Sequence, residues 1–135
     1  MIRERQVLVC ELDGRLAETL RPLCQSRGWR LNEVRHPRVC LGLLPQGGQS
    51  VFVLRVGRDL VREFTLLSDV ARLFPQTATV VVCDVDPAVS GLAWELGAKF
   101  VLHPAEIHEL LPEVIAGILT DESPASVGVS RSWGL

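Results

Sequence analysis

The chain has few aromatic residues, a single lysine and no long hydrophobic run. Aromatic side chains make up 5% of its 135 residues, and none of them is tyrosine. Every apolar run is shorter than the roughly 18–20 residues that a membrane-spanning helix needs. The first six residues, MIRERQ, are charged, and no small-residue cleavage site follows them, unlike in a secretory signal peptide. We therefore expect no membrane association and a cytoplasmic location.

The charged residues nearly balance. Fourteen basic and sixteen acidic side chains give a net charge of −2 at pH 7. Because no dense basic run is present, we expect no nucleic-acid interface. Thirteen of the fourteen basic residues are arginine, and Lys99 is the only lysine. The position of Lys99 therefore decides whether a mechanism that needs lysine can operate.

The cysteines are widely separated and form no C-x-x-C motif; they are Cys10, Cys24, Cys40 and Cys83. His36 and His108 have no metal-ligand spacing and are expected at the surface. Such a pattern predicts four buried, reduced thiols in a cytosolic protein, with a redox pair or a metal site as the alternative. We expect no cofactor and no metal.

Short apolar runs alternate with segments of helical periodicity. The runs predict strands at 7–10, 29–34, 50–56, 79–83 and 100–102. Helices are predicted at about 16–27, 37–44, 60–74, 87–96 and 108–119. Pro22 should kink or shorten the first helix, and Pro112 fits only the first turn of the last one. The domain is predicted at 1–119, and residues 120–135 lose all periodicity, which is typical of a flexible tail.

This alternation predicts a single α/β domain with a flavodoxin-like parallel sheet of five strands, in the order 2-1-3-4-5, and with helices on both faces. In such sheets, ligands bind beyond the carboxyl ends of the strands. The candidate site residues are those at these ends: Glu11, Asp13, Arg55, Cys83, Asp84 and His103.

The layout over about residues 5–120 resembles the receiver domain of bacterial response regulators, the CheY-like family. The acidic end of the first strand, Gly97-Ala98 after the fourth helix and His103-Pro104 after the fifth strand carry the resemblance. The resemblance implies an acidic pair and a phosphoacceptor aspartate that hold Mg²⁺. It also implies a hydroxyl and a lysine that bind the phosphoryl oxygens.

The sequence departs from that pattern at both acidic positions. Glu11 matches the first acid, but Leu12 stands where the second is expected and Asp13 comes one residue late. Arg55 falls at the phosphoacceptor position, and a guanidinium neither ligates Mg²⁺ nor accepts a phosphoryl group in this chemistry.

The positions that bind the phosphoryl oxygens also differ. Cys83, or Val82 if the loop is one residue short, replaces the hydroxyl, and His103 replaces the lysine. Lys99 lies near the start of the fifth strand, four residues away. We therefore predict a degenerate pseudo-receiver, not an enzyme and not phosphorylated.

Two further hypotheses concern this group. Arg55 is predicted to pair with Glu11, Asp13 or Asp84, replacing the metal and locking one conformation; the alternative is that it extends into solvent. His103 is expected to satisfy local backbone groups, with a phosphate or proton site as the alternative. The resemblance also implies a cis His103-Pro104 bond.

Three more residues have two interpretations each. Asp59 and Asp86 are predicted helix N-caps, although Asp59 or Asp84 could serve as a shifted phosphoacceptor. Trp94 lies off the apolar face formed by Val89, Leu92, Ala93 and Leu96, so it should be partly exposed. It is either a partner anchor or packs across its own helix.

The predicted function is signalling through protein–protein interaction. The partner is a signalling protein or a second receiver-like domain, and a homodimer would use the face formed by the fourth helix, fifth strand and fifth helix. The alternatives are an atypical phosphorylatable receiver and a small-molecule-binding flavodoxin-like protein. No glycine-rich phosphate loop follows the first strand, where Asp13-Gly14-Arg15 predicts only a turn.

Overall fold

Five parallel strands in the order β2-β1-β3-β4-β5 form the centre of the protein. They are β1 (Gln6–Cys10), β2 (Arg30–Val34), β3 (Ser50–Arg55), β4 (Ala78–Val82) and β5 (Phe100–Leu102). The computed structural model describes residues 5–44, 50–84 and 86–120, so the predicted tail lies outside the described residues except for Thr120. The predicted fold class and strand order are confirmed.

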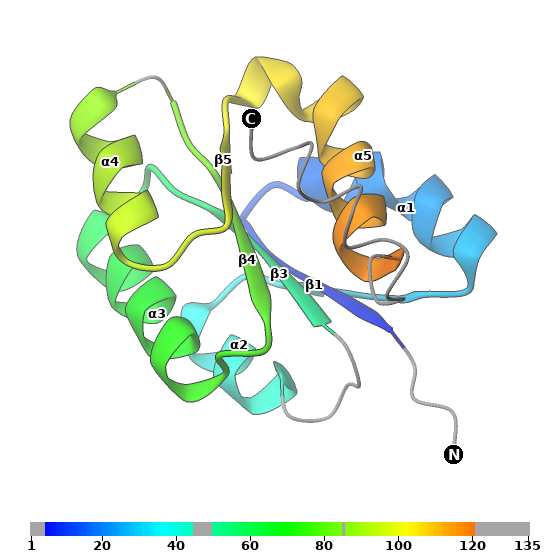
Figure 1. Cartoon of the computed structure of the whole chain (residues 1–135), viewed down its shortest axis with the longest axis horizontal. Coiled ribbons are helices and arrows are strands. Elements are labelled where there is room, and N and C mark those ends of the chain that lie inside the picture. The colour runs from blue at the N-terminus through cyan, green and yellow to red at the C-terminus, as the bar shows by residue number, and fades with distance from the viewer. Residues whose placement is uncertain (1–4, 45–49, 85, 121–135) are drawn as a thin grey trace.

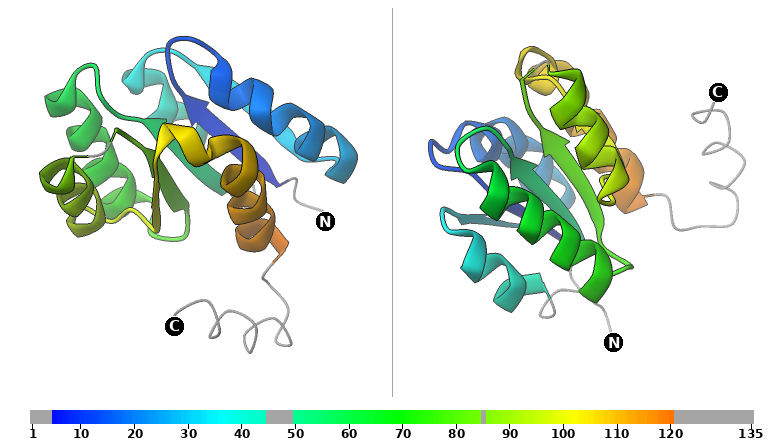
Figure 2. Two further views of the ribbon diagram at one scale, coloured as in Figure 1. Left: turned by 90° about the horizontal axis from the view of Figure 1, so that it is seen from above. Right: turned by 90° about the vertical axis from the view of Figure 1, so that its left-hand side faces the viewer.

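Helices cover both faces of the sheet, as Figures 1 and 2 show. On one face lie α1 (Arg15–Arg27) and α5 (Ile107–Thr120), the latter preceded by the short 3-10 helix η2 (Pro104–Glu106). On the other face lie α2 (Pro37–Leu43), α3 (Leu60–Leu73) and α4 (Pro87–Glu95). Over the described residues, no helix combines the length and the apolar character needed to span a bilayer.

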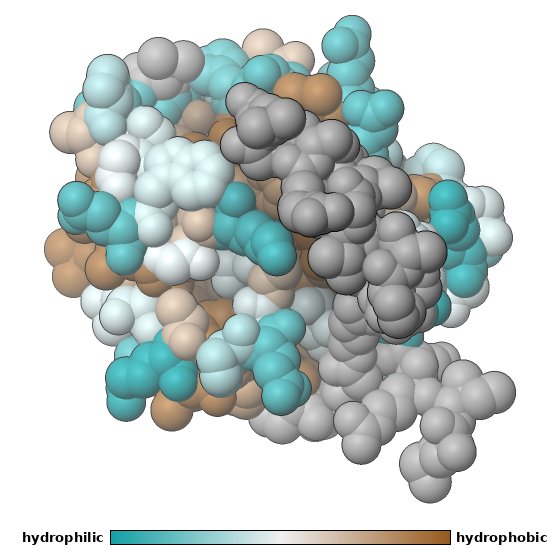
Figure 3. All heavy atoms as spheres, in the orientation of Figure 1, coloured by the Kyte–Doolittle hydropathy of each residue, from teal (hydrophilic) through white to brown (hydrophobic). Residues whose placement is uncertain are grey.

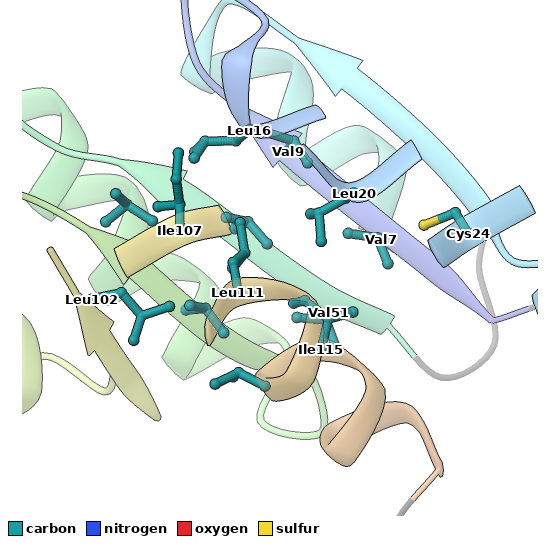
Figure 4. Close-up of a cluster of buried hydrophobic side chains, with 14 of the residues drawn as sticks. Val7, Val9, Leu16, Leu20, Cys24, Val51, Leu102, Ile107, Leu111 and Ile115 are labelled. Carbon is teal, nitrogen blue, oxygen red and sulfur yellow. The ribbon is translucent and has the colours of Figure 1, made fainter. Parts of the chain in front are cut away.

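Each central strand is buried on both sides, which explains its continuous apolar sequence. Val7 and Val9 of β1 pack with α1 and α5, whereas Leu8 and Cys10 pack toward the other three helices. Figure 4 shows the first of these clusters, in which Leu111 of α5 lies against the sheet. Burying each such aliphatic side chain contributes roughly 1.5–3 kcal/mol, so the two clusters together hold the helices on the sheet.

Local side-chain chemistry sets the beginnings of two helices. Asp59 accepts a hydrogen bond from the Arg62 N–H at 3.3 Å, and Asp86 accepts one from the Ala88 N–H at 3.0 Å. Both predicted N-caps are confirmed. After α4, Gly97 has φ of +115°, and a Cβ there would lie 2.7 Å from the Ala71 Cβ of α3. Glycine is therefore required where the chain turns from α4 toward β5.

Three sequence predictions are wrong. Pro112 lies in the second turn of α5, not the first. Pro22 lies inside α1, which continues to Arg27, so of the two predicted effects of Pro22 a shortened helix is excluded. In both helices a long buried face outweighs the loss of one backbone hydrogen bond. Leu92 is 40% exposed, because α4 presses mainly Ala93 into the core. The described chain has no cis peptide, so the His103-Pro104 bond is trans.

All four thiols are free and buried, as predicted. Cys10 of β1 and Cys40 of α2 lie in the same core cluster, and a hydrogen bond from the Cys40 thiol lowers the pKa of Cys10. No disulfide links the cysteines, and no group of three His, Cys, Asp or Glu residues in the described part of the chain could hold a metal.

Candidate functional site

The carboxyl edge of the sheet encloses a cavity of about 370 Å³. Four of the predicted site residues line it, together with the β2–α2 and β3–α3 loops: Glu11, Asp13, Arg55 and Asp84. They meet there because Glu11 directly follows β1, and Arg55 ends β3, the neighbouring strand. Cys83 and His103 follow β4 and β5 but do not line this cavity.

Glu11 serves as the cap of α1. The N-terminal position of that helix is Gly14, which has no side chain to offer. The Glu11 carboxylate instead accepts hydrogen bonds from the N–H groups of Leu16 and Ala17, each at 2.9 Å. Burial raises the pKa of Glu11, and the two N–H groups oppose this shift. Both carboxylate oxygens are thus engaged in holding a helix end.

Asp13 is exposed and interacts with the first residue of α1. It accepts the Arg15 N–H at 3.1 Å, and the Arg15 Nε lies 3.7 Å from its second oxygen. The Arg15 N–H is the main cause that lowers the pKa of Asp13, and the Arg55 guanidinium adds to it. Between the two acids, Leu12 is 42% exposed at the cavity.

Arg55 is half-buried and borders two cavities. One is the cavity described above, and the other, of about 660 Å³, lies between α1 and the start of α5. Among the described residues, no carboxylate lies within 4.0 Å of its guanidinium. The predicted ion-pair lock is therefore wrong, because Glu11 is directed to the α1 amides and Asp13 to Arg15. At longer range, the Arg55 guanidinium adds to the lowering of the pKa of Asp13 and offsets part of the rise in the pKa of Cys83.

Glu63 is a site residue that the sequence reasoning missed. It lies in the first turn of α3, is 8% exposed, and lines the cavity. Its carboxylate accepts hydrogen bonds from Gly57 N–H at 2.9 Å and Arg58 N–H at 3.4 Å. Glu63 therefore fixes the β3–α3 loop. A glutamate in a first helical turn is common, and its only distinguishing feature in the sequence is the glycine turn six residues before it.

The remaining predicted positions have structural partners or lie at the surface. Burial is the main cause that raises the pKa of the Cys83 thiol. Asp84 is exposed at the cavity wall. His103 accepts the Ala105 N–H on Nδ1 at 3.0 Å, and its backbone N–H donates to Glu106 Oε1 at 2.9 Å. His103 thus satisfies local backbone groups, as predicted, and caps η2.

Trp94 is 50% exposed on α4. The predicted exposure of Trp94 is confirmed, and it does not pack fully across its helix. Its role as a partner anchor stays a prediction.

Comparisons with known proteins point to one fold. No family profile matches the chain, and no curated protein matches it in sequence. A CheY-like receiver domain protein of Methanospirillum hungatei superposes with a TM-score of 0.71 at 13% identity, covering 88% of this chain and 97% of that one. A CheY-like protein (tadZ) of Pseudomonas aeruginosa superposes with a TM-score of 0.70 at 19% identity, covering 85% of this chain and 98% of that one. An orphan response regulator of H. pylori superposes with a TM-score of 0.68 at 13% identity, covering 83% of this chain and 94% of that one.

The chain has the fold of CheY-like receiver domains from two-component response regulators, and this fold spans almost all of the described residues. Identities of 13–19% show the fold alone, because one fold supports many functions. Function must be argued from the side chains at the carboxyl edge.

Proposed function

We propose that this protein is a receiver-like signalling domain that works without phosphorylation and without enzymatic activity, through binding to another protein. The observation that carries the proposal is the state of Glu11 and Arg55. Arg55 places a permanent cation at the end of β3. Glu11, the acid that could ligate a metal, has both oxygens hydrogen-bonded to the start of α1.

The other side chains at this edge support the same proposal. Leu12 supplies no oxygen ligand beside Glu11. The Nδ1 atom of His103 is occupied by the Ala105 N–H. Lys99 precedes β5 and is exposed, so it lies at the opposite end of that strand from the cavity. Phosphoryl transfer requires a nucleophilic carboxylate and neutralisation of the donor's charge, and these residues supply neither in the expected places.

Incubation with acetyl phosphate and Mg²⁺, followed by intact-mass measurement, tests the proposal. We expect no adduct of about 80 Da on the wild-type chain. The matched variant Arg55→Asp restores a carboxylate at the end of β3, and we expect it to stay unmodified too, because Glu11 and His103 remain engaged. An adduct on the wild-type chain, mapped to Asp59 or Asp84, would establish the atypical phosphorylatable receiver and refute the proposal.

Receiver domains act on other proteins, and we propose that this chain does so as well, in a cytoplasmic setting where its four thiols stay reduced. Trp94 is the proposed contact on α4, because large exposed aromatics anchor many interfaces. If this face forms a homodimer, sedimentation velocity should show a dimer that Trp94→Ala abolishes. A monomer at all concentrations would leave only a heterologous partner for this face.

A further inference from the structure

Two nucleophilic thiols in the interior, those of Cys10 and Cys40, have no role in the proposed function. On the face shown in Figure 3, the described hydrophobic residues are interspersed with hydrophilic ones, whereas all four thiols of the chain are buried. Cys24 lies in the core cluster on the opposite face of the sheet, and Cys83 follows β4, two strands away from β1. Cys10 and Cys40, in contrast, lie beside each other.

Cys10 and Cys40 come from two elements that pack together. Cys10 is the last residue of β1, and Cys40 lies in the middle of α2, which packs against β1. Both residues belong to one core cluster, and a hydrogen bond joins their thiols. The Cys40 Sγ also lies 4.0 Å from the His36 carbonyl oxygen at the start of α2. The fold therefore places side by side two sulfur atoms that are far apart in the sequence, as a disulfide requires.

Only one thiol of the pair faces a cavity. Cys10 lines the carboxyl-edge cavity of about 370 Å³, whereas Cys40 is fully buried and does not line it. Because a water molecule occupies roughly 30 Å³, a molecule as small as hydrogen peroxide fits into this cavity. A small oxidant therefore reaches Cys10 before Cys40.

The contact between the thiols also makes them chemically unequal. The hydrogen bond from Cys40 lowers the pKa of Cys10, although burial and the Glu63 and Glu11 carboxylates oppose this shift. The same hydrogen bond, together with burial, raises the pKa of Cys40. Because the thiolate is the form that attacks an oxidant, Cys10 is the better nucleophile and Cys40 the thiol that reacts after it.

We infer that Cys10 and Cys40 form a reversible redox site that hydrogen peroxide closes to a disulfide. The Cys10 thiolate attacks one peroxide oxygen, the O–O bond breaks, and the departing hydroxide takes up the proton that Cys10 released. The Cys40 sulfur then attacks the sulfur of the Cys10 sulfenic acid. The S–S bond forms, the S–O bond breaks, and the oxygen leaves with the Cys40 proton as water. The thiols are oxidised, and the peroxide is reduced to water.

Closing the disulfide moves α2. Bonded sulfur atoms lie about 2.05 Å apart, closer than hydrogen-bonded ones, so α2 must shift toward the end of β1. The loop before α2 moves with it, and Arg35 and His36 of this loop line the carboxyl-edge cavity. In a reducing compartment the disulfide is transient, because dithiols reverse it. This redox site is independent of the proposed function, since it needs neither a partner protein nor a phosphoryl group.

The test treats the folded, full-length chain with hydrogen peroxide, then denatures it and alkylates the remaining thiols with iodoacetamide. We expect two alkylated cysteines in place of the four free ones of the untreated chain. Tryptic digestion should yield peptides 6–15 and 39–55 joined by a bond that dithiothreitol breaks. The matched control Cys24→Ala/Cys83→Ala keeps only the proposed pair, and the same two peptides should be joined in it.

Two single variants separate the two steps. Cys40→Ala removes the second thiol, so Cys10 should stop at the sulfenic acid, which dimedone traps. Cys10→Ala should leave Cys40 unmodified, because Cys40 is fully buried. Circular dichroism melting shows whether each variant folds, and peptide mapping of the wild-type chain decides the inference if one of them does not.

Four alkylated cysteines after peroxide treatment, or a disulfide that contains Cys24 or Cys83, would overturn the inference. So would equal yields of the joined peptides from the folded chain and from the chain unfolded in urea, because the fold would then contribute nothing to the pairing. In ¹⁵N spectra of the wild type, peroxide should shift the amides of α2, and dithiothreitol should return them. Unchanged α2 amides in a chain with the disulfide would refute the movement of α2.

Discussion

Removing the Glu11 side chain tests the claim that this acid holds a helix end. In Glu11→Ala, the N–H groups of Leu16 and Ala17, both in buried residues, lose their acceptors at 2.9 Å. Leaving a buried donor unsatisfied costs about 1–3 kcal/mol, so the pair costs about 2–6 kcal/mol. Removing a carboxylate whose pKa is raised by burial recovers part of this. We expect a loss of about 3 kcal/mol in the free energy of unfolding.

Thermal melting followed by circular dichroism measures this loss. At roughly 4 °C per kcal/mol for a domain of this size, the Tm should fall by about 12 °C. Glu11→Gln keeps one acceptor oxygen and should lose about half as much. Glu18→Ala is the control, because Glu18 is an exposed acid in the first turn of the same helix. If Glu11→Ala melts like Glu18→Ala, the capping role is refuted.

Glu11 should also make the free energy of unfolding depend on pH, with a definite sign. The pKa of Glu11 is raised in the folded chain above its ordinary value of 4.5, so the folded state binds this proton more tightly than the unfolded state does. Ionising Glu11 therefore costs more free energy in the folded chain than in the unfolded chain. The part of the stability that depends on this proton is present below pH 4.5 and is lost as pH rises through the folded-state pKa, while the hydrogen bonds to the Leu16 and Ala17 N–H groups remain. In urea titrations at several pH values, Glu11→Gln should lack this decline, and the wild type should show it. Identical pH profiles for the two chains would contradict the sign.

Three further substitutions follow from contacts in the structure. Arg55→Gln should change the free energy of unfolding by less than about 1 kcal/mol, because no described carboxylate lies within 4.0 Å of Arg55. A loss above about 2 kcal/mol in urea titration would instead support the hypothesis of an ion pair at Arg55. Glu63→Ala should cost about 2 kcal/mol and should speed hydrogen exchange at the Gly57 and Arg58 amides, which it now binds; unchanged exchange would mean that the loop holds itself. Gly97→Ala should lower the Tm by at least about 4 °C, because the added Cβ would lie 2.7 Å from the Ala71 Cβ and residue 97 has φ of +115°. A Tm equal to that of the wild type would show that α3 shifts to accommodate the added Cβ without loss of stability.

Hydrophobic pattern and turn chemistry in the sequence determined the fold. The predicted strands at 7–10 and 100–102, the caps Asp59 and Asp86, and the strand order 2-1-3-4-5 all agree with the structure. Strand and helix periods are local properties, and the topology of short α/β chains has few solutions. The proline position misled the prediction at Pro112, because the packing of a long buried helix face outweighs one missing backbone bond.

The candidate site was only partly accessible from the sequence. Parallel strands end at one edge, so the meeting of Glu11, Asp13, Arg55 and Asp84 at a single cavity follows from their positions in the chain. Which partner each charged side chain takes does not follow, because it depends on distances of a few ångströms between elements. Glu11 binds amides of α1, and Arg55 has no described carboxylate within 4.0 Å.

Local patterns in the chain therefore predict the layers, the strand order and the set of groups at the carboxyl edge. Contacts between elements, in contrast, commit Glu11 and Glu63 to backbone amides and leave Arg55 with no described carboxylate within 4.0 Å. The difference arises from the distance along the chain over which each property is set. Periodicity records how each residue faces its own element, whereas hydrogen bonds and ion pairs depend on contacts between elements that fold from distant parts of the chain.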